Sequence, residues 1–556
     1  MPEGERFRIG DILPVVGGWV LQGNPEVEFD GYCIDSRYVD GRSIFVPLMG
    51  QSRDGHQFVI DAVHEGAVAA FVRAGHQQVH EIVSWLSERS KRGGRQGNHE
   101  VCLIEVRHTL VALQKLAEWF RLQFDAKVVG ITGSVGKTGT KEMLIQLLST
   151  KYPTVGTEKN FNNEIGVPLA LAQIRPRTKM AVIEMAMRAR GEVSLLSRIT
   201  RPDLAIITNT TASHVGRLGS FDEIYKAKCE IVDGLAPEGT VILNRRDENA
   251  HAIAAELRKR AGQGRELDLS YFDTSAAFLT SGMPPFMVPG SRNGEKGDLP
   301  KADVWVEDVE LEGLDGSTFT LCTDEERVAI KLNILGRGSV ENLTAAAAAA
   351  VRLGISLDEI GEAAPDLLPA PQRLNLFQLA DELFLVDDCY NSSPASALDS
   401  LEFMLNLDNR YRKILILGDM LELGKFETLL HRQYAQAALS HPFHTIYAVG
   451  PRMNAVNEVE GREDIELYYV EGSSNYKAQA ADHSSTARFG QTFGGGQAQR
   501  REGRHEILDD RAAAKLSALL LNLLGQDDSP TVILVKGARA LHLERVVNDV
   551  LSEIHS

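Results

Sequence analysis

Short apolar runs alternate with helical patterns of apolar residues along most of the chain. In the first hundred residues, the apolar run at 43–48 predicts a strand, and the spacing at 58–67 predicts a helix. The polar stretch at 90–99 precedes a further strand and predicts an exposed loop. We therefore expect a small N-terminal α/β domain over residues 1–108.

The alternation continues in a central segment, where the strands are apolar along their whole length. These runs lie at 180–185, 204–209 and 240–244, with helical patterns between them. Such strands are typical of a parallel sheet that helices cover on both faces, and ligands of these sheets bind at the carboxyl ends of the strands. We expect a central domain with a parallel sheet over residues 109–365.

A third alternating segment predicts a second doubly wound sheet. Its apolar runs lie at 383–388, 413–418, 445–450 and 531–537. We expect a Rossmann-like domain over residues 366–556, which makes the fold class α/β in three domains. The stretch near 472–504 is rich in Gly, Gln, Ser and Arg and almost free of apolar residues, which predicts a disordered insertion.

A glycine-rich loop separates an apolar strand from a helical segment in the central domain, with the sequence Gly133-Ser-Val-Gly-Lys-Thr. Glycines let backbone N–H groups turn toward an anion, the lysine supplies an ammonium group for the β- and γ-phosphates, and the threonine hydroxyl suits Mg²⁺. The residues expected to contact the nucleotide are Gly133, Ser134, Gly136, Lys137, Thr138 and Gly139. The loop is a variant, because Ile131 stands where the usual pattern has its first glycine.

This loop predicts ATP or GTP with Mg²⁺ as ligands and a P-loop-type ATPase in the central domain. Adenine is favoured, because the chain has no Asn-Lys-x-Asp element to read guanine. Glu184 ends one apolar run, where its carboxylate can hold Mg²⁺ beside Thr138. His214, considered alone, reads as a surface histidine or one with satisfied hydrogen bonds, but its place after a parallel strand favours a ligand.

Composition and charge exclude several classes of protein. The net charge of −17 argues against a general nucleic-acid binder, and the five cysteines form no Cys-x-x-Cys pair that would indicate zinc or a disulfide framework. The N-terminus lacks a signal-peptide pattern, and no apolar run reaches the roughly 18 residues needed to cross a bilayer. We expect a cytoplasmic monomer that neither binds nucleic acid nor inserts into a membrane.

The motifs and their order resemble the Mur ligases, ATP-dependent enzymes that form amide bonds in peptidoglycan assembly, over nearly the whole chain. The motifs are Asp35-Ser-Arg, Asp54-Gly-His, Gly133-Ser-Val-Gly-Lys-Thr, Asn160-Phe-Asn-Asn-Glu, Glu184-Met-Ala-Met, Asn209-Thr-Thr-Ala-Ser-His, Asp387-Asp-Cys-Tyr-Asn, Gly418-Asp-Met-Leu-Glu-Leu-Gly and Lys536-Gly-Ala-Arg. Within the family they are most similar to the enzymes that add D-alanyl-D-alanine to UDP-N-acetylmuramoyl-tripeptide. The resemblance thus implies these two substrates, with ATP and Mg²⁺ as cofactors.

The resemblance also implies a mechanism. ATP phosphorylates the terminal carboxylate of the nucleotide-linked peptide, the amine of D-alanyl-D-alanine attacks the acyl phosphate, and phosphate leaves. By position, Lys137 would hold the β- and γ-phosphates, Thr138 and Glu184 would bind one Mg²⁺, and His214 would bind a second. The expected catalytic residues are Lys137, His214 and Lys228.

Lys228 matches the lysine that the family carbamylates, which turns an ammonium group into a carboxylate-like metal ligand. Without the resemblance it reads as a solvated helix residue, and Lys226 is the alternative register. In the first domain, the resemblance assigns Ser36 and Arg37 to the UDP diphosphate, whereas from the residues alone a capped turn is an equal alternative.

Further contacts follow from the resemblance in the same way. Asp388 and Asn391 would meet nucleotide or dipeptide, although two aspartates at a strand end could equally be a helix N-cap. The remaining expected contacts are Asn342 and Arg373 for the nucleotide and Asn162 and Asn163 for substrate.

The chain departs from the family pattern in three motifs. The first is Gly336-Arg-Gly-Ser-Val-Glu-Asn, which lacks the usual histidine and first asparagine of Gly-x-His-Asn-x-x-Asn. The second is Tyr390-Asn-Ser-Ser-Pro, which differs from the family pattern at two positions, and the third is Lys536-Gly-Ala-Arg, which differs at one. These departures leave two alternatives open. One is another Mur-type ligase with a different amine substrate, and the other is a catalytically silent ATP-binding partner protein.

Overall fold

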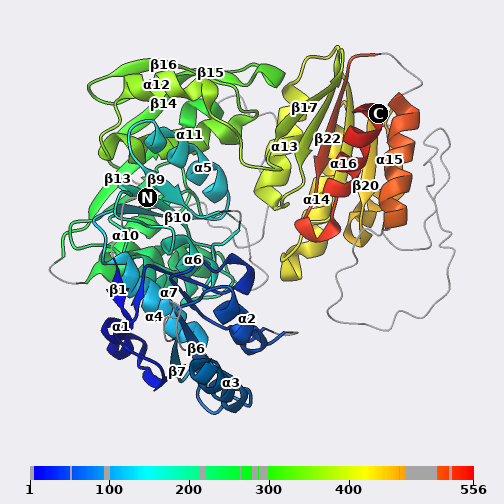
Figure 1. The fold of residues 1–556 in the computed structure, drawn as a ribbon. Coiled ribbons are helices and arrows are strands. Elements are labelled where there is room, and N and C mark those ends of the chain that lie inside the picture. The colour runs from blue at the N-terminus through cyan, green and yellow to red at the C-terminus, as the bar shows by residue number, and fades with distance from the viewer. Residues whose placement is uncertain are drawn as a thin grey trace.

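The computed structural model describes residues 6–50, 53–92, 101–158, 160–211, 220–262, 265–278, 286, 299–462, 464–470, 510–524 and 529–555. Within them the chain forms sheets of five, nine and six strands and one two-stranded sheet (Figure 1). His214 and the predicted insertion near 472–504 lie outside the described residues.

The first large sheet has the strand order β2-β7-β6-β5-β4, in which β4 to β7 are parallel and β2 is antiparallel to β7. Its strands are β2 (Trp19–Gln22), β4 (Gly31–Cys33), β5 (Ser43–Phe45), β6 (Ala69–Arg73) and β7 (Cys102–Val106). The helices are α1 (Ile9–Val16), α2 (Val59–His64) and α3 (Val79–Arg92). The predicted helix at 58–67 begins instead with a 3₁₀ turn, η2 (Gly55–Phe58), which Asp54 caps through the His56 N–H.

The central sheet has the strand order β16-β15-β14-β13-β12-β11-β8-β10-β9. Its strands are β8 (Lys127–Thr132), β9 (Thr154–Gly156), β10 (Met180–Glu184), β11 (Leu204–Ile207), β12 (Thr240–Asn244), β13 (Asp268–Asp273), β14 (Val304–Leu311), β15 (Ser317–Cys322) and β16 (Arg327–Leu332). The pairs from β9 to β14 are parallel, as predicted, but β14, β15 and β16 pair antiparallel. Short connections explain the difference, since only antiparallel neighbours can be joined by a tight turn.

Helices cover both faces of this sheet. They are α4 (Thr109–Arg121), α5 (Lys137–Ser149), α6 (Gly166–Leu171), α7 (Glu192–Thr200), α9 (Phe221–Cys229), α10 (Ala250–Ala261), α11 (Arg337–Arg352) and α12 (Leu357–Ala363). Neighbouring strand residues face opposite cores: Val128 packs with α4 and α7, whereas Val129 packs with α5 and α11. The alanine run at 345–350 is buried in the second of these cores.

The third large sheet has the strand order β17-β18-β22-β19-β20-β21 and is parallel except for β17. Its strands are β17 (Asn375–Ala380), β18 (Leu383–Asp388), β19 (Arg412–Gly418), β20 (Thr445–Val449), β21 (Glu466–Val470) and β22 (Thr531–Lys536). Its helices are α13 (Pro394–Asn406), α14 (Glu427–Ser440), α15 (Asp510–Leu524) and α16 (Glu544–His555). Because β18 and β22 are adjacent, Asp388 and Lys536 lie side by side at their carboxyl ends.

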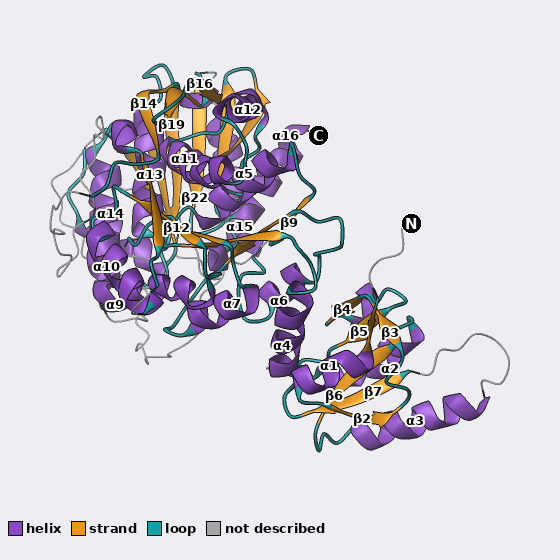
Figure 2. Ribbon diagram, turned by 90° about the vertical axis from the view of Figure 1, so that its left-hand side faces the viewer, coloured by secondary structure: helices purple, strands orange, loops and turns teal. Residues whose placement is uncertain are grey.

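The first large sheet is joined to the central sheet through α4. Figure 2 shows the first sheet set apart from the other two, with α4 between it and the central sheet. Phe7 packs edge-on against Trp119 and Phe120 of α4, which joins the first core to the central one. The domain boundaries after residues 108 and 365 stay predictions. Among the described residues, no helix has both the length and the apolar character needed to cross a bilayer.

Candidate active site

The phosphate-binding loop lies between β8 and α5, and close packing explains its glycines. A Cβ on Gly133 would lie 1.9 Å from Thr208 Oγ1, and Gly136 has a φ of 86°. A side chain at Gly139 would come within 2.3 Å of Asn342 Nδ2. The loop therefore requires glycine where the neighbouring strand and α11 approach it most closely.

Lys137 is the first residue of α5 and folds back over the loop. Its Nζ donates hydrogen bonds to the carbonyl oxygens of Gly133 at 2.8 Å and Ser134 at 3.0 Å. Burial lowers the pKa of Lys137 to about 8, although Glu184 opposes this shift. The ammonium group thus lies at the helix N-terminus, where the phosphates of a nucleotide would meet it.

Thr138 and Glu184 form a pair of oxygen ligands beside Lys137. Thr138 Oγ1 donates to Glu184 Oε2 at 2.9 Å, and Asn162 Nδ2 donates to Glu184 Oε1 at 2.8 Å. Arg373 Nη2 donates to Thr138 Oγ1 at 3.2 Å. Hydroxyl and carboxylate oxygens are the ligands that Mg²⁺ prefers, so Thr138 and Glu184 fit the predicted ion.

Lys228 lies in the last turn of α9 and is only 1% exposed. Its Nζ has no hydrogen-bond partner among the described residues. Burial, with a further contribution from the charge of Lys137, holds the pKa of Lys228 well below its usual value. The interpretation of Lys228 as a solvated helix residue is therefore wrong, whereas Lys226 is partly exposed and pairs with Glu223 at 3.3 Å.

Two cavities open around the phosphate-binding loop. The larger cavity, of about 960 Å³, is lined by residues of the central and third regions, among them Lys137, Thr138, Asn162, Glu184, Asn391 and Arg539. The smaller cavity, of about 330 Å³, lies on the other side of the loop, between α11 and α13, and its lining includes Asn342 and Asp388. Gly136 and Arg373 line both cavities, so the two meet at the loop.

In the third region, Asp388 accepts hydrogen bonds from Lys536 Nζ at 2.7 Å and Ser400 Oγ at 2.6 Å. The N-cap of α13 is Ser393, so the alternative prediction of Asp388 as a helix cap is wrong. The contact of Ser400 with Asp388 was not predicted, because Ser400 lies inside α13 with no sequence motif around it.

The asparagines near the loop differ in their contacts. Asn342 Oδ1 accepts a long hydrogen bond from Thr140 Oγ1 at 3.4 Å, which places α11 against α5. Asn163 Oδ1 accepts from the N–H groups of Ile165 and Gly166 in the turn before α6, and Asn163 also lines the larger cavity. Asn209 holds Val135 in the loop through both its Oδ1 and its Nδ2.

The predicted diphosphate contacts in the first region lie in an exposed turn. Asp35 caps the 3₁₀ turn η1 (Ser36–Tyr38) by accepting from the Arg37 N–H, and Arg37 Nη2 pairs with Asp35 Oδ2 at 2.6 Å. The Arg37 side chain is 80% exposed. The alternative of a capped turn is thus present in the structure, and neither Ser36 nor Arg37 lines the two cavities.

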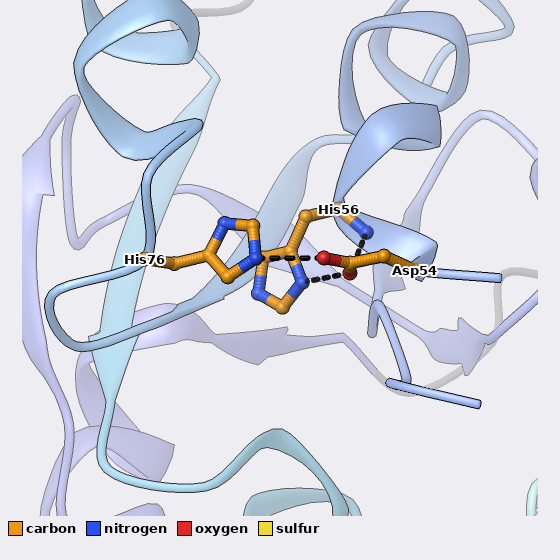
Figure 3. Close-up of side chains that lie close together, drawn as sticks. All are labelled: Asp54, His56 and His76. Carbon is orange, nitrogen blue, oxygen red and sulfur yellow. Dashed lines mark hydrogen bonds and ion pairs between the residues drawn. The ribbon is translucent and has the colours of Figure 1, made fainter. Parts of the chain in front are cut away.

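The Asp54-Gly-His motif forms a cluster of three polar side chains (Figure 3). Asp54 pairs with His56 Nδ1 and with His76 Nε2, both at 2.7 Å, and the two imidazole rings stack at 3.9 Å. His56 Nε2 accepts from the Arg73 N–H at 3.0 Å, which fixes the ring proton on Nδ1. His56 Nδ1, which faces Asp54, therefore has no lone pair for a metal. The hydrogen bond from Arg73 to His56 also holds η2 against β6.

Comparisons with known proteins decide the family. The model of the Mur ligase middle domain matches residues 131–280. The UDP-N-acetylmuramoyl-tripeptide–D-alanyl-D-alanine ligase of Bacillus subtilis is 33% identical over 74% of this chain and 78% of its own length. The chain belongs to the MurF family of Mur ligases. The enzyme of the same name from Treponema pallidum is a MurF relative at 31% identity over 82% of this chain and 89% of its own length.

Solved structures agree with the fold of a MurF ligase. MurF from Acinetobacter baumannii matches with a TM-score of 0.74 at 26% identity, covering 99% of both chains. MurF from Thermotoga maritima, solved in complex with ADP, matches with a TM-score of 0.67 at 22% identity over 94% of this chain and 98% of that one. The predicted family and the three-part α/β fold class are thus confirmed.

Proposed function

We propose that this chain joins D-alanyl-D-alanine to UDP-N-acetylmuramoyl-tripeptide in two steps. First, a terminal carboxylate oxygen of the peptide attacks the γ-phosphorus of ATP and ADP leaves, which gives an acyl phosphate. Second, the dipeptide amine attacks the acyl carbon, phosphate leaves, and the nitrogen loses a proton as the amide forms. The overall reaction, in peptidoglycan precursor synthesis, is that of the MurF family.

One observation carries this mechanism: the buried Lys228 is close enough to the partly buried Lys137 and to Glu184 to feel their charges, and Lys137 and Glu184 line a cavity shared with the third region. Lys137 places a cation at the phosphate end of this cavity, where negative charge concentrates during phosphoryl transfer. Thr138 and Glu184 supply oxygen ligands, and a bound Mg²⁺ would neutralise the phosphate oxygens there.

We assign to Lys228 a second charge-balancing role. Burial lowers the pKa of this amine and so favours its neutral form, which can attack CO₂, forming a nitrogen–carbon bond and releasing a proton. The resulting carbamate is an anion with two oxygen ligands, close to the positive charge of Lys137. His214 stays a proposed ligand of a second metal ion.

The substrate contacts are proposals of the same kind. Ser36 and Arg37 would bind the UDP diphosphate, after Arg37 exchanges Asp35 for phosphate oxygens. The residues proposed for nucleotide, peptide or dipeptide are Asn162, Asn163, Asn342, Arg373, Asp388 and Asn391, all of which line one or both cavities. The monomeric state and the cytoplasmic location stay predictions.

The test is phosphate release by the purified protein with Mg²⁺-ATP and UDP-N-acetylmuramoyl-tripeptide, with and without D-alanyl-D-alanine. We expect release to depend on the dipeptide and the product mass to rise by that of the dipeptide less water. Release with another amine but not with this dipeptide would support the different-substrate alternative. ATP binding without release would support the silent-partner alternative, which the altered segment at Gly336 motivates.

A further inference from the structure

The segment at the start of α11 is anchored to the third region by an apolar and an ionic contact. Leu335 is buried in the hydrophobic core of the third region, with Val386 and Leu401. Two residues later, Arg337 pairs with Glu402 and, at 3.4 Å, with Asp399, both on α13. The side chains of Arg337 and Glu402 are 11% and 5% exposed, so this ion pair is shielded from water.

This ion pair lies at the wall of the smaller cavity. Arg337 and Asp399 both line the cavity, whereas Glu402 lies behind them and does not line it. Ser400, also on α13, donates a hydrogen bond to Asp388, which accepts a second one from Lys536 Nζ. A side chain of α13 thus orients the carboxylate of Asp388 within the cavity that both residues line.

The other end of the same contact reaches the phosphate-binding loop. Asn342 lies one and a half turns along α11 from Arg337 and packs against Gly136 and Gly139. A single helix thus contacts the loop through Asn342 and α13 through Arg337. Any movement of α13 away from α11 would widen the cavity between them.

Charge makes Arg337 necessary for this contact. Burial raises the pKa of Asp399 to about 6, with further contributions from Glu341 and Glu402, while Arg337 opposes the shift. Asp399 and Glu402 therefore both pair with the Arg337 guanidinium, and its removal would take a positive partner from two carboxyl groups at a shielded site beside Glu341.

We infer that Arg337 is a positioning residue that holds α13, and with it Asp388, against the nucleotide cavity. The inference rests on the proposed ATP site. A guanidinium binds both carboxylates through its rigid planar fork, a geometry that the ammonium group of a lysine does not have. The contact crosses from the central to the third region, so it links nucleotide binding to the relative position of these two regions.

The experiment is equilibrium binding of ADP by calorimetry to the wild-type protein and to the variants Arg337→Met, Arg337→Lys and Glu402→Leu. Glu402→Leu is decisive, because Glu402 does not line the cavity and cannot contact the nucleotide directly. We expect about tenfold weaker binding for Arg337→Met and Glu402→Leu, and partial recovery for Arg337→Lys, since breaking a buried pair is costly. In turnover assays, the KM for ATP should rise with much less change in kcat.

Asp233→Asn provides the matched control. Asp233 pairs with Arg260 at 2.6 Å, also with little exposure, but both residues belong to the central region. We expect it to lower the melting temperature without changing ADP affinity. If folded Glu402→Leu binds ADP like the wild type, the inference is wrong, even when Arg337→Met binds weakly. Should Arg337→Met not fold, Glu402→Leu and Arg337→Lys still decide.

This experiment separates the inference from the proposed function. Failure of the wild-type protein to release phosphate in response to dipeptide would refute the proposed ligase reaction, whereas ADP binding by the variants would still test the contact. Normal ligase activity with unchanged ADP affinity in Glu402→Leu would refute the contact alone.

Discussion

The phosphate-binding loop and the turn that carries Arg37 are built in opposite ways. Around the loop, Thr138 and Glu184 are buried, Lys137 is partly buried, and all three are already bonded to one another or to the backbone. In the turn, Arg37 is 80% exposed and pairs with Asp35, two residues away. The first site is organised before any ligand binds, and the second must give up an ion pair to bind one.

The difference follows from the backbone that carries each site. The loop residues come from β8, β10 and α5, whose ends meet at one edge of a parallel sheet and are fixed by packing on both faces. Arg37 lies in a short 3₁₀ turn after β4, and its partner Asp35 has a side chain that is 34% exposed. We therefore expect changes in the loop to affect catalysis and changes in the turn to affect substrate binding.

Lys137→Ala should have the largest effect. Removing the ammonium group from the phosphate site should lower kcat/KM by about 10³-fold or more. The fold should survive, because the carbonyl oxygens of Gly133 and Ser134, which lose their hydrogen bonds from Lys137, can accept from water instead. The measurement is dipeptide-dependent phosphate release together with a melting curve. Near-normal turnover in the folded variant would refute the role of the loop.

Lys228→Ala should come next, with a loss of about 10²–10³-fold in kcat, since it removes a charge-balancing group from the same site. Carbon-13 bicarbonate should give a carbamate signal in the wild-type protein that is absent in the variant. Lys226→Ala is the control, because Lys226 lies two residues away and is partly exposed. An unlabelled Lys228 in an active enzyme would contradict the carbamate, and a large loss in Lys226→Ala would indicate the other register.

The sequence predicted the phosphate-binding loop better than it predicted the contacts around it. Apolar strands and the loop motif predicted the central sheet and the meeting of Lys137, Thr138 and Glu184, because residues at parallel strand ends converge. Burial of Lys228 was not predictable, since it depends on packing around α9 rather than on local pattern. The bonds of Asp388 to Ser400 and Lys536 were equally hidden, the latter because the two residues lie 148 positions apart.

Arg37→Ala should have a smaller effect of a different kind. Loss of a charge-assisted contact to the diphosphate should raise the KM for UDP-N-acetylmuramoyl-tripeptide about tenfold and leave kcat and the KM for ATP nearly unchanged. Arg42→Ala is the matched control, as this arginine lies in the same region, has a side chain that is 42% exposed and approaches Glu28 at 3.9 Å. A loss of kcat in Arg37→Ala, or an equal rise of KM in Arg42→Ala, would contradict the proposed diphosphate contact.

Dependence on pH should give the smallest effect and should distinguish the two sites in one protein. Burial lowers the pKa of Lys137 to about 8, and bound phosphates favour its charged form, so ADP binding takes up a proton above that pH. ADP affinity should be flat below pH 8 and fall by up to about tenfold per pH unit above it. The pKa of Arg37, raised by its hydrogen bonds with Asp35, leaves that side chain charged throughout.

Affinity for UDP-N-acetylmuramoyl-tripeptide should therefore stay constant over the range in which ADP affinity falls. Calorimetry with each ligand between pH 7 and 9.5 measures both, and adenosine, which has no phosphates, is the control for general effects on the cavity. If ADP affinity stayed flat to pH 9.5 in the folded protein, Lys137 would not be the titrating contact. If both affinities fell together, the contrast between a preformed buried site and an exposed one would not hold.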